Sequence, residues 1–198
     1  MTPARATGVA ECVINISEGR DRAVIDTVAL AGGGQLLDVH TDADHHRSVL
    51  TLAGDLPEVE AAARRVAASA VANIDLTAHA GVHPRLGAVD VVPFVPLADP
   101  DGTTTSWDAI VAARDAFATW AGNTLGVPCF HYGPERSLPE VRRAAFTTLA
   151  PDAGPPVPHP TAASRPTRCR RSTPYGRPPR WPLPWGGEPA DRHRGPVW

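Results

Sequence analysis

The sequence is short of several residue types and segments that would direct it to particular protein classes. It has 19 arginines and no lysine, and it has three cysteines. Cys12, Cys129 and Cys169 are too few and too scattered for a disulfide framework or a zinc-binding pair. It has no apolar run of membrane-spanning length, and its first residues lack the apolar stretch of a signal peptide. The sequence therefore predicts a cytoplasmic protein with reduced thiols and no membrane span.

Charge and proline divide the chain into two parts. Residues 1–150 hold 18 acidic residues and 11 arginines, whereas residues 151–198 hold three acidic residues and eight arginines. The second part also contains 13 of the 22 prolines and three of the five tryptophans. We therefore expect one folded domain over residues 9–150, followed by a segment of another kind.

The segment 164–198 has the composition of a disordered region. It shows neither a strand period nor a helix period, and its many prolines and glycines oppose both structures. The absence of lysine indicates a GC-rich coding sequence, and a shifted reading frame of such DNA yields arginine, proline, glycine and tryptophan in quantity. Two interpretations follow: a frame-shift product, which the composition favours, or a native Pro/Arg-rich extension that binds nucleic acid or another partner. We also expect residues 1–8 to be disordered.

Residues 9–150 alternate between strand and helix patterns. The expected strands cover residues 9–16, 35–41, 48–53, 89–95 and 127–132. The expected helices cover residues 22–30, residues 57–74, a stretch from a Thr105–Asp108 capping pair to Gly126, and residues 138–149. The first six elements, in the order β-α-β-β-α-β, predict an α+β fold with a ferredoxin-like sheet and both helices on one face. An additional α-β-α unit would extend it.

A histidine and an arginine flank a proline in the loop before strand 89–95. Pro84 favours an extended backbone at His83, which would present the imidazole on a stiff loop. Histidine can take up and return a proton near neutral pH, and Arg85 can hold a carboxylate through two parallel hydrogen bonds. This pairing suits an acidic small-molecule substrate. A turn histidine beside a surface arginine would explain the same residues without a site.

Two other polar stretches are candidates for ligand binding. Asn15, Ser17 and the backbone near Gly19 could hydrogen-bond a ligand where strand 9–16 ends, or could form an ordinary turn. The second stretch has enough carboxylates and imidazoles to bind a divalent metal, but its spacing fits no standard zinc pattern, so we predict no metal. Its members are Asp38, His40, Asp42, Asp44, His45, His46 and Arg47.

Four stretches of the sequence together resemble glutamate formiminotransferase. They are ECVINISEGRD, LLDVHTDADHHRSV, GVHPRLGAVDVVPFVPL and GVPCFHYG, of which the third is the most specific. The resemblance extends over residues 9–161 and identifies the chain as the N-terminal subdomain of that domain, which in animals is fused to a cyclodeaminase. Members tend to dimerise, so a homodimer is expected.

The resemblance also implies a reaction and its residues. The family transfers a formimino group from N-formimino-L-glutamate to N5 of tetrahydrofolate, the co-substrate, in histidine degradation and one-carbon metabolism. The histidine of its His-Pro-Arg motif is catalytic, which here is His83. Candidates for substrate binding are Arg85 and Arg47 for carboxylates, Asp38 for a nitrogen, Asn15 at the strand end, and Gly154, Pro155, Pro156 and Thr161 for the pterin.

Several departures from the family limit this expectation. The family often has proline where Ile14 stands, and some members have an acid at His40 or a glutamate at Val82. The largest departure follows Thr161, where the family continues into a second α/β half that completes the folate cleft. Three hypotheses remain open: a weak or inactive transferase, a non-catalytic remnant, and a binding module whose basic tail contacts nucleic acid, for which the composition gives little support.

Overall fold

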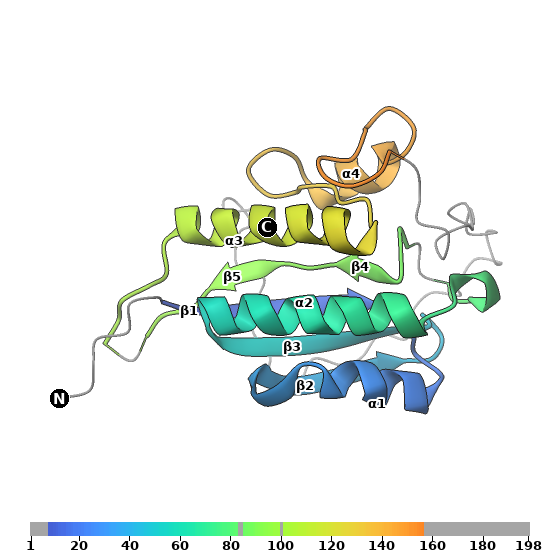
Figure 1. Ribbon diagram of the computed structural model, residues 1–198, viewed down its shortest axis with the longest axis horizontal. Coiled ribbons are helices and arrows are strands. Elements are labelled where there is room, and N and C mark those ends of the chain that lie inside the picture. The colour runs from blue at the N-terminus through green and yellow to red at the C-terminus, as the bar shows by residue number, and fades with distance from the viewer. Residues whose placement is uncertain (1–7, 83–84, 100, 157–198) are drawn as a thin grey trace, which may run out of the picture.

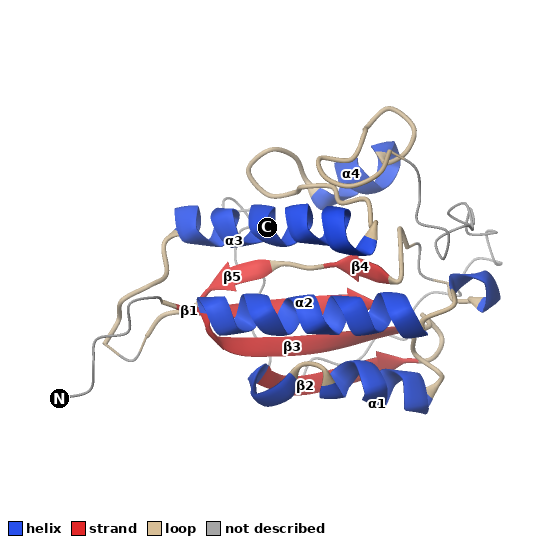
Figure 2. Ribbon diagram, in the orientation of Figure 1, coloured by secondary structure: helices blue, strands red, loops and turns tan. Residues whose placement is uncertain are grey.

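The sheet at the centre of this protein is open and antiparallel. The computed structural model describes residues 8–82, 85–99 and 101–156. Within them, five strands form one sheet in the order β2-β3-β1-β4, and β5 also pairs with β1. The three long strands are β1 (Val9–Ile16), β2 (Leu36–Asp42) and β3 (Arg47–Asp55). Figures 1 and 2 show that the helices α1, α2 and α3 lie across one face of this sheet.

The alternation of side chains along β1 and β3 separates the two faces of the sheet. Ile14 and Ile16 on β1, and Leu50 and Leu52 on β3, are fully buried under the helices. The residues between them are only half-buried and point to the opposite face, because successive side chains of a strand alternate. Burial of these aliphatic side chains stabilises the fold by about 1.5–3 kcal/mol each.

Three helices cover the buried face. The helix α1 (Arg22–Leu30) begins at Asp21, whose carboxylate accepts the amides of Ala23 and Val24. The helix α2 (Leu56–Asn73) has Pro57 in its first turn and packs its alanine- and valine-rich side on β1 and β3, with α1 beside it. The helix α3 (Trp107–Trp120) packs on β5 and touches α2.

The ferredoxin-like prediction is confirmed. The first six elements occur in the expected order, and the expected bounds 9–16 and 22–30 match β1 and α1. The sheet order places β1 in the interior between β3 and β4, as two βαβ crossovers require.

The expected strand 89–95 is two short strands. They are β4 (Val89–Val91) and β5 (Phe94–Pro96), and both pair with β1. Between them lie Val92 and Pro93, and the proline has no amide hydrogen to donate to a neighbouring strand. This edge is therefore interrupted at Pro93.

Three predictions beyond this strand are wrong. Residues 127–132 form no strand, since Cys129 makes only an isolated bridge with Ala153. The helix α3 is capped by Ser106 and not by Thr105, because the Thr105 hydroxyl donates to the carbonyl of Val9 instead. The last helix, α4 (Leu138–Ala144), is shorter than expected: the backbone leaves the helical region at Ala145, and Phe146 has a φ of 59°.

Shorter helical turns connect these elements: η1 (Gly33–Gln35), η2 (Leu76–Ala78) and the π-helical turn η3 (Ala121–Leu125). Among the described residues, no helix has the length and apolar character needed to cross a membrane. The predictions made for residues 1–7 and 157–198, including the tail, lie outside the described residues.

Candidate functional site

Three of the predicted substrate-binding residues lie on the face of the sheet opposite the helices. Asn15 on β1 and His40 on β2 both pair with Val49 on β3. Asp38 on β2 pairs with Thr51, which lies two residues further along β3 and so on the same face as Val49. Because directly paired residues share a face, Asn15 and Asp38 project from the same side. Arg47 begins β3 and pairs with Asp42. The sheet therefore presents polar side chains at one end of its uncovered face.

The backbone is locally irregular where Asp38 sits. The pairing of β2 with β3 shifts between Leu36 and Asp38, and Leu37, the extra residue, is 68% exposed. A bulge of this kind re-aims the side chains that follow it. Asp38 and His40 are both exposed on this edge strand. Asn15 is held by its own strand, because its amide Nδ2 donates to the carbonyl of Val13 at 3.1 Å.

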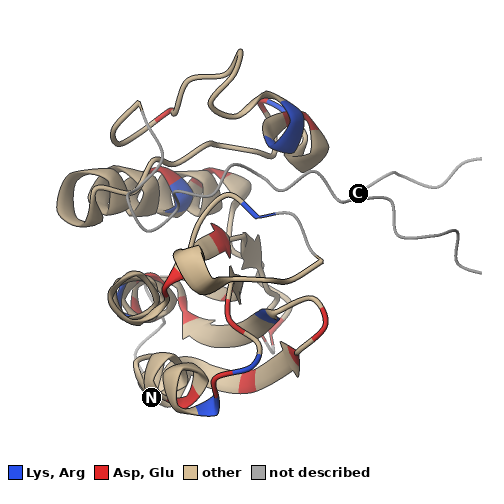
Figure 3. Cartoon of the chain, turned by 90° about the vertical axis from the view of Figure 1, so that its right-hand side faces the viewer, with Lys and Arg blue, Asp and Glu red and all other residues tan. Residues whose placement is uncertain are grey.

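Three chain segments meet closely where β1 ends. They are the turn after β1, the β2–β3 turn and the loop that follows η2, as Figure 3 shows from this end of the sheet. A Cβ at Gly19 would lie 2.3 Å from the carbonyl oxygen of Asp42, and one at Gly81 would lie 2.3 Å from that of His45. Arg20 links the other two segments, since its guanidinium donates to the carbonyls of Ala43 and Ala80 at 2.8 and 3.2 Å. These contacts leave room only for glycine at positions 19 and 81.

A cluster of one glutamate and two histidines fills this junction. We call Glu18, His46 and His79 the sheet-end cluster. The imidazoles of His46 and His79 stack with their centroids 4.0 Å apart, and Nε2 of His46 lies 2.9 Å from Oε1 of Glu18. Nε2 of His79 lies 2.8 Å from the carbonyl oxygen of His46. His46 is 8% exposed and has a φ of 52°, a strained conformation for a residue with a side chain.

The electrostatics of the cluster favour an ionised Glu18 and a neutral His79. Burial alone would raise the pKa of Glu18, but the amides of Asp21 and Arg20 and the His46 imidazole lower it below its ordinary value. For His79, burial lowers the pKa, and the nearby Arg85 and His46 lower it further against the opposing effect of its hydrogen bond to His46.

Arg85 lies directly beside this cluster. Its guanidinium donates to the carbonyl of His79 at 3.4 Å, and partial burial lowers its pKa. The structure thus places Arg85 at the same end of the sheet as Asn15 and Arg47. His83 and Thr161, the catalytic and pterin-contacting candidates, lie outside the described residues.

The loop that follows Arg85 is fixed by a buried carboxylate. The side chain of Asp90 is 1% exposed and accepts the amide of Leu86 at 3.0 Å and the guanidinium of Arg142 at 2.6 Å. On the other side, the Ser17 hydroxyl donates to the carbonyl of Gly87 at 2.7 Å. Residues 86–90 are therefore tied to both β1 and α4.

The remaining described candidates, Gly154, Pro155 and Pro156, lie elsewhere. Gly154 has a φ of 86° and packs against the backbone of Gly122 and Val127, near the end of α3. This region lies next to α4, whereas Asp38 lies on β2 at the opposite edge of the sheet (Figure 1). The structure does not bring these two groups together.

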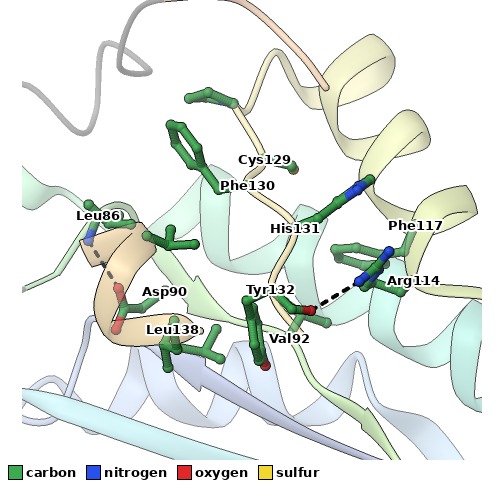
Figure 4. Close-up of a pocket in the computed structure, with 14 residues that line it drawn as sticks. Leu86, Asp90, Val92, Arg114, Phe117, Cys129, Phe130, His131, Tyr132 and Leu138 are labelled. Carbon is green, nitrogen blue, oxygen red and sulfur yellow. Dashed lines mark hydrogen bonds between the residues drawn. The ribbon is translucent and has the colours of Figure 1, made fainter. Parts of the chain in front are cut away.

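A small cavity lies between α3, α4 and the segment 128–132. Its volume is about 100 Å³, and its wall is largely apolar, with Asp90, Arg114, His131 and Tyr132 among the polar members (Figure 4). Asp90 and Arg114 already bond to protein groups, including the carbonyl of Tyr132 for Arg114. The cavity therefore presents mainly aliphatic and aromatic side chains.

Residues 8–82, 85–99 and 101–156 contain no group of three histidine, cysteine or acidic residues placed to hold a metal ion. Within the polar stretch that suggested one, Asp42 and His45 bond to each other at 2.6 Å. The backbone amides of Asp44 and His45 also donate to Asp42. These contacts shape a turn.

Comparison with known sequences decides the family. The profile of the formiminotransferase domain, N-terminal subdomain, matches residues 9–165. The chain belongs to the formiminotransferase family. This confirms the resemblance carried by the His-Pro-Arg segment and its three companions.

Named relatives agree with this assignment. The chain is 39% identical over 173 residues to the glutamate formimidoyltransferase of Streptococcus pyogenes serotype M1, which covers 78% of this chain and 56% of that one. It is 40% identical over 134 residues to the glutamate formimidoyltransferase of Thermoplasma acidophilum, covering 66% and 43%. With the formimidoyltransferase-cyclodeaminase of Sus scrofa it shares 37% identity over 164 residues, covering 73% and 29%. The chain thus spans about half the length, or less, of these relatives.

Within this formiminotransferase subdomain, sequence reasoning gave no role to Glu18, His79 or Asp90. Their partners are distant in the sequence: 28 residues separate Glu18 from His46, and 52 separate Asp90 from Arg142. One signal was available for Glu18, whose carboxylate accepts the amides of the three residues leading into α1. An acidic residue just before a helix start is a candidate for such bonds.

Proposed function

We propose that this chain is the N-terminal subdomain of a glutamate formimidoyltransferase. The reaction would move the formimino group of N-formimino-L-glutamate to N5 of tetrahydrofolate, the co-substrate. The observation that carries the proposal is the 39% identity, over 78% of this chain, to a relative named for this activity. The meeting of the β1 end, the β2–β3 turn and the loop around the His-Pro-Arg motif at one end of the sheet supports it.

The chemistry requires two proton transfers. N5 of tetrahydrofolate attacks the formimino carbon and gives a tetrahedral intermediate, after which the bond to the glutamate nitrogen breaks. The attacking nitrogen must lose a proton, and the departing nitrogen must gain one. A single histidine can carry out both transfers in sequence, and we assign this role to His83. General acid–base catalysis of this kind contributes about 10²–10⁴ in rate.

Arginines and hydrogen-bonding side chains at this end of the sheet would bind the substrates. The formimino donor carries carboxylates, which Arg85 and Arg47 would bind through charge-assisted hydrogen bonds. Asn15 and Asp38 project from the same face of the sheet and would hydrogen-bond nitrogen and oxygen atoms of a substrate. Segment 154–161 would contact the pterin. Holding both substrates with their reacting atoms in place adds to the rate, because a reaction between two bound molecules replaces one between two freely diffusing molecules.

The structure fixes the residues on both sides of His83 and Pro84. On one side, the amide of Val82 donates to the carbonyl of Asp44 at 3.3 Å. On the other, Leu86 is bound by Asp90, which Arg142 neutralises. Flanking residues fixed in this way suit a proton carrier between them, because catalytic geometry tolerates displacements of well under 1 Å.

We further propose that the chain alone turns over slowly or not at all. It spans 56% of the length of its Streptococcus relative, and a cleft for two substrates would need the other half. A partner half, or a second copy of the chain in a homodimer, would have to complete the site.

A chimeric enzyme tests both statements. Residues 1–156 of this chain would be joined to the remaining part of the Streptococcus pyogenes enzyme and assayed with N-formimino-L-glutamate and tetrahydrofolate. We expect turnover by the chimera and little or none by the 198-residue chain. His83→Ala should lower kcat of the chimera by about 10²–10⁴.

The matched control is His131→Asn, which changes a histidine near α3 that has no proposed role in the reaction. It should leave kcat within about twofold of the parent. Robust turnover by the chain alone would contradict the need for a second half, and a chimera with His83→Ala at full activity would remove the histidine from its role.

The nucleotide sequence that encodes the tail distinguishes its two proposed origins, a shifted reading frame and a native extension. If the tail is a frame-shift product, another frame beyond codon 161 should encode an α/β sequence similar to the missing half. Only stop codons and unrelated sequence in the other frames would favour a native tail. Nucleic-acid binding by the full chain with a steep salt dependence, lost from residues 1–156, would support the binding-module hypothesis.

A further inference from the structure

One imidazole makes two of the contacts that hold the loop leading to the His-Pro-Arg motif. Nδ1 of His79 accepts the amide of Gly81 at 3.2 Å, and Nε2 of His79 contacts the carbonyl oxygen of His46 at 2.8 Å. A carbonyl can only accept, so Nε2 must carry the hydrogen, and Nδ1 must be without one to accept from Gly81. The two contacts together define His79 as the neutral Nε2–H tautomer.

The second imidazole of the stack is bound on one side only. Nε2 of His46 donates to Oε1 of Glu18, an oxygen that also accepts three backbone amides. Nδ1 of His46 is buried and, within the described residues, has no hydrogen-bond partner. The ring is therefore held by Glu18, by its stacking on His79 and by its strained backbone, in which φ is 52°.

Groups from three other parts of the fold lie close to His79 or its loop. Arg85, from its own loop, bonds to the His79 carbonyl, and Arg20, from the turn after β1, bonds to the carbonyl of Ala80. His46 stacks on it from the β2–β3 turn, and Glu18 beneath is the nearby carboxylate. A positive charge on the His79 ring would lie in a partly buried site close to the Arg85 guanidinium.

Protonation of His79 would also break a bond. A protonated Nδ1 is a donor and would point at the amide of Gly81, which is itself a donor. A Cβ at Gly81 would lie 2.6 Å from Cβ of His46 and 2.8 Å from Cε1 of His79, so the loop cannot shift there without disturbing the stack. Loss of this bond would loosen the loop at Gly81, while the amide of Val82 on the carbonyl of Asp44 and Arg20 on the carbonyl of Ala80 would remain.

We propose that neutral His79 is the positioning residue that fastens Gly81 to the β2–β3 turn, so that the approach to the His-Pro-Arg motif is anchored at Gly81 above the pH at which this imidazole takes up a proton and is loosened there below it. His79 acts on the loop and not on a substrate. Its importance for catalysis rests on the proposed function of His83 and Arg85, whereas the anchoring itself does not.

Nuclear magnetic resonance on the full chain labelled with ¹⁵N tests the proposal without any turnover. At pH 7 the ring nitrogens of His79 should show the Nε2–H tautomer. On acidification, the His79 ring and the amide of Gly81 should titrate with the same midpoint, below 6.5, the ordinary value for histidine. An Nδ1–H tautomer, or a Gly81 amide that does not follow the His79 ring, would overturn the proposal.

Two variants sharpen the measurement. In His79→Asn the shorter side chain retains an acceptor for the Gly81 amide but has no group that titrates, so the Gly81 signal should become independent of pH. In His79→Ala the protection of the Gly81 amide against hydrogen exchange should fall about fivefold, as expected for one lost hydrogen bond.

The control is His45→Asn, which changes the exposed histidine that precedes His46 in the sequence. It should leave the Gly81 titration at its original midpoint. A Gly81 titration that persists in His79→Asn would assign the pH response to another group and refute the proposal. Because the unmodified chain already reports the tautomer and the midpoint, the test does not depend on the variants being folded.

Discussion

Two polar regions of this subdomain hold its loops by different means. The sheet-end cluster uses a carboxylate and two stacked imidazoles, of which His79 must be neutral to accept the amide of Gly81. The second region, which we call the arginine edge, consists of three ion pairs around α3 and α4: Arg142–Asp90, Arg114–Glu135 and Arg136–Asp152. Arginine remains charged at every pH of interest.

This difference separates the pH ranges over which the two regions keep their bonds. The sheet-end cluster is sensitive near and below the ordinary histidine value of 6.5. The arginine edge weakens only when its carboxylates take up protons. The Arg114 guanidinium, through its hydrogen bonds, lowers the pKa of Glu135 to about 2. Mild acid should therefore loosen one region and leave the other intact.

The largest effect is expected where the arginine edge is most buried. Arg142→Met would remove the guanidinium that donates to the carboxylate of Asp90, whose side chain is 1% exposed. Removal of one partner of a buried pair costs about 3–5 kcal/mol of unfolding free energy. Urea denaturation would measure it. The neighbouring exposed Arg143→Met is the control and should change stability by less than about 0.5 kcal/mol. Equal effects of the two changes would show that Asp90 does not depend on Arg142.

A steric change tests the sheet end. Gly81→Ala would place a Cβ 2.3 Å from the carbonyl oxygen of His45, a backbone atom that cannot easily move. Overpacking of this kind costs about 1–3 kcal/mol. Gly34→Ala is the matched control, because a Cβ there meets nothing within 4 Å. A thermal melt in which both variants equal the parent would mean that the junction is looser than its contacts indicate.

A smaller effect is expected at the exposed part of the arginine edge. Because the pKa of Glu135 falls from 4.5 to about 2 on folding, the pair adds stability above pH 4.5, and this is lost as the pH falls toward 2. The Glu135 side chain is 39% exposed, so solvent screening reduces the contribution to about 1 kcal/mol or less. Glu135→Gln should remove this acid dependence from the denaturation curves, whereas the parent should retain it.

A similarly small effect is expected from His79. Its pKa is lowered on folding, so stability is complete above the ordinary value of 6.5. Below that value the unfolded chain binds a proton that the folded protein resists, and stability falls until the folded His79 is also protonated. A single hydrogen bond at a half-buried ring limits the loss to about 1 kcal/mol. His79→Asn should flatten the curve in this range, and an unchanged slope would separate His79 from the acid response.

Local sequence signals predicted the first half of the fold well. The alternation in β1, the Asp21 cap of α1 and Pro57 in the first turn of α2 are all short-range features. They are decided by steric and hydrogen-bonding preferences within a few residues, so a single sequence contains them.

Prediction failed where a distant partner decides the structure. Residues 127–132 have strand-like composition, yet within the described part of the chain the only strand-type contact there is the bridge between Cys129 and Ala153. Thr105 suits a helix cap, but the carbonyl of Val9, 96 residues away, takes its hydroxyl. Neither competitor is visible in the neighbouring sequence.

For the candidate site, the sequence by itself determined which chemistry is available: a His-Pro-Arg motif, a second arginine, and polar residues that alternate along strands. The family match confirmed the ancestry that this motif indicated. Only the tertiary structure decided that Glu18, His46 and His79 form one cluster, that Arg85 lies beside it, and that Gly154 lies away from Asp38. The physical reason is that hydrogen bonds and stacking depend on distances of a few ångströms, which the path of the folded chain sets and the order of residues does not.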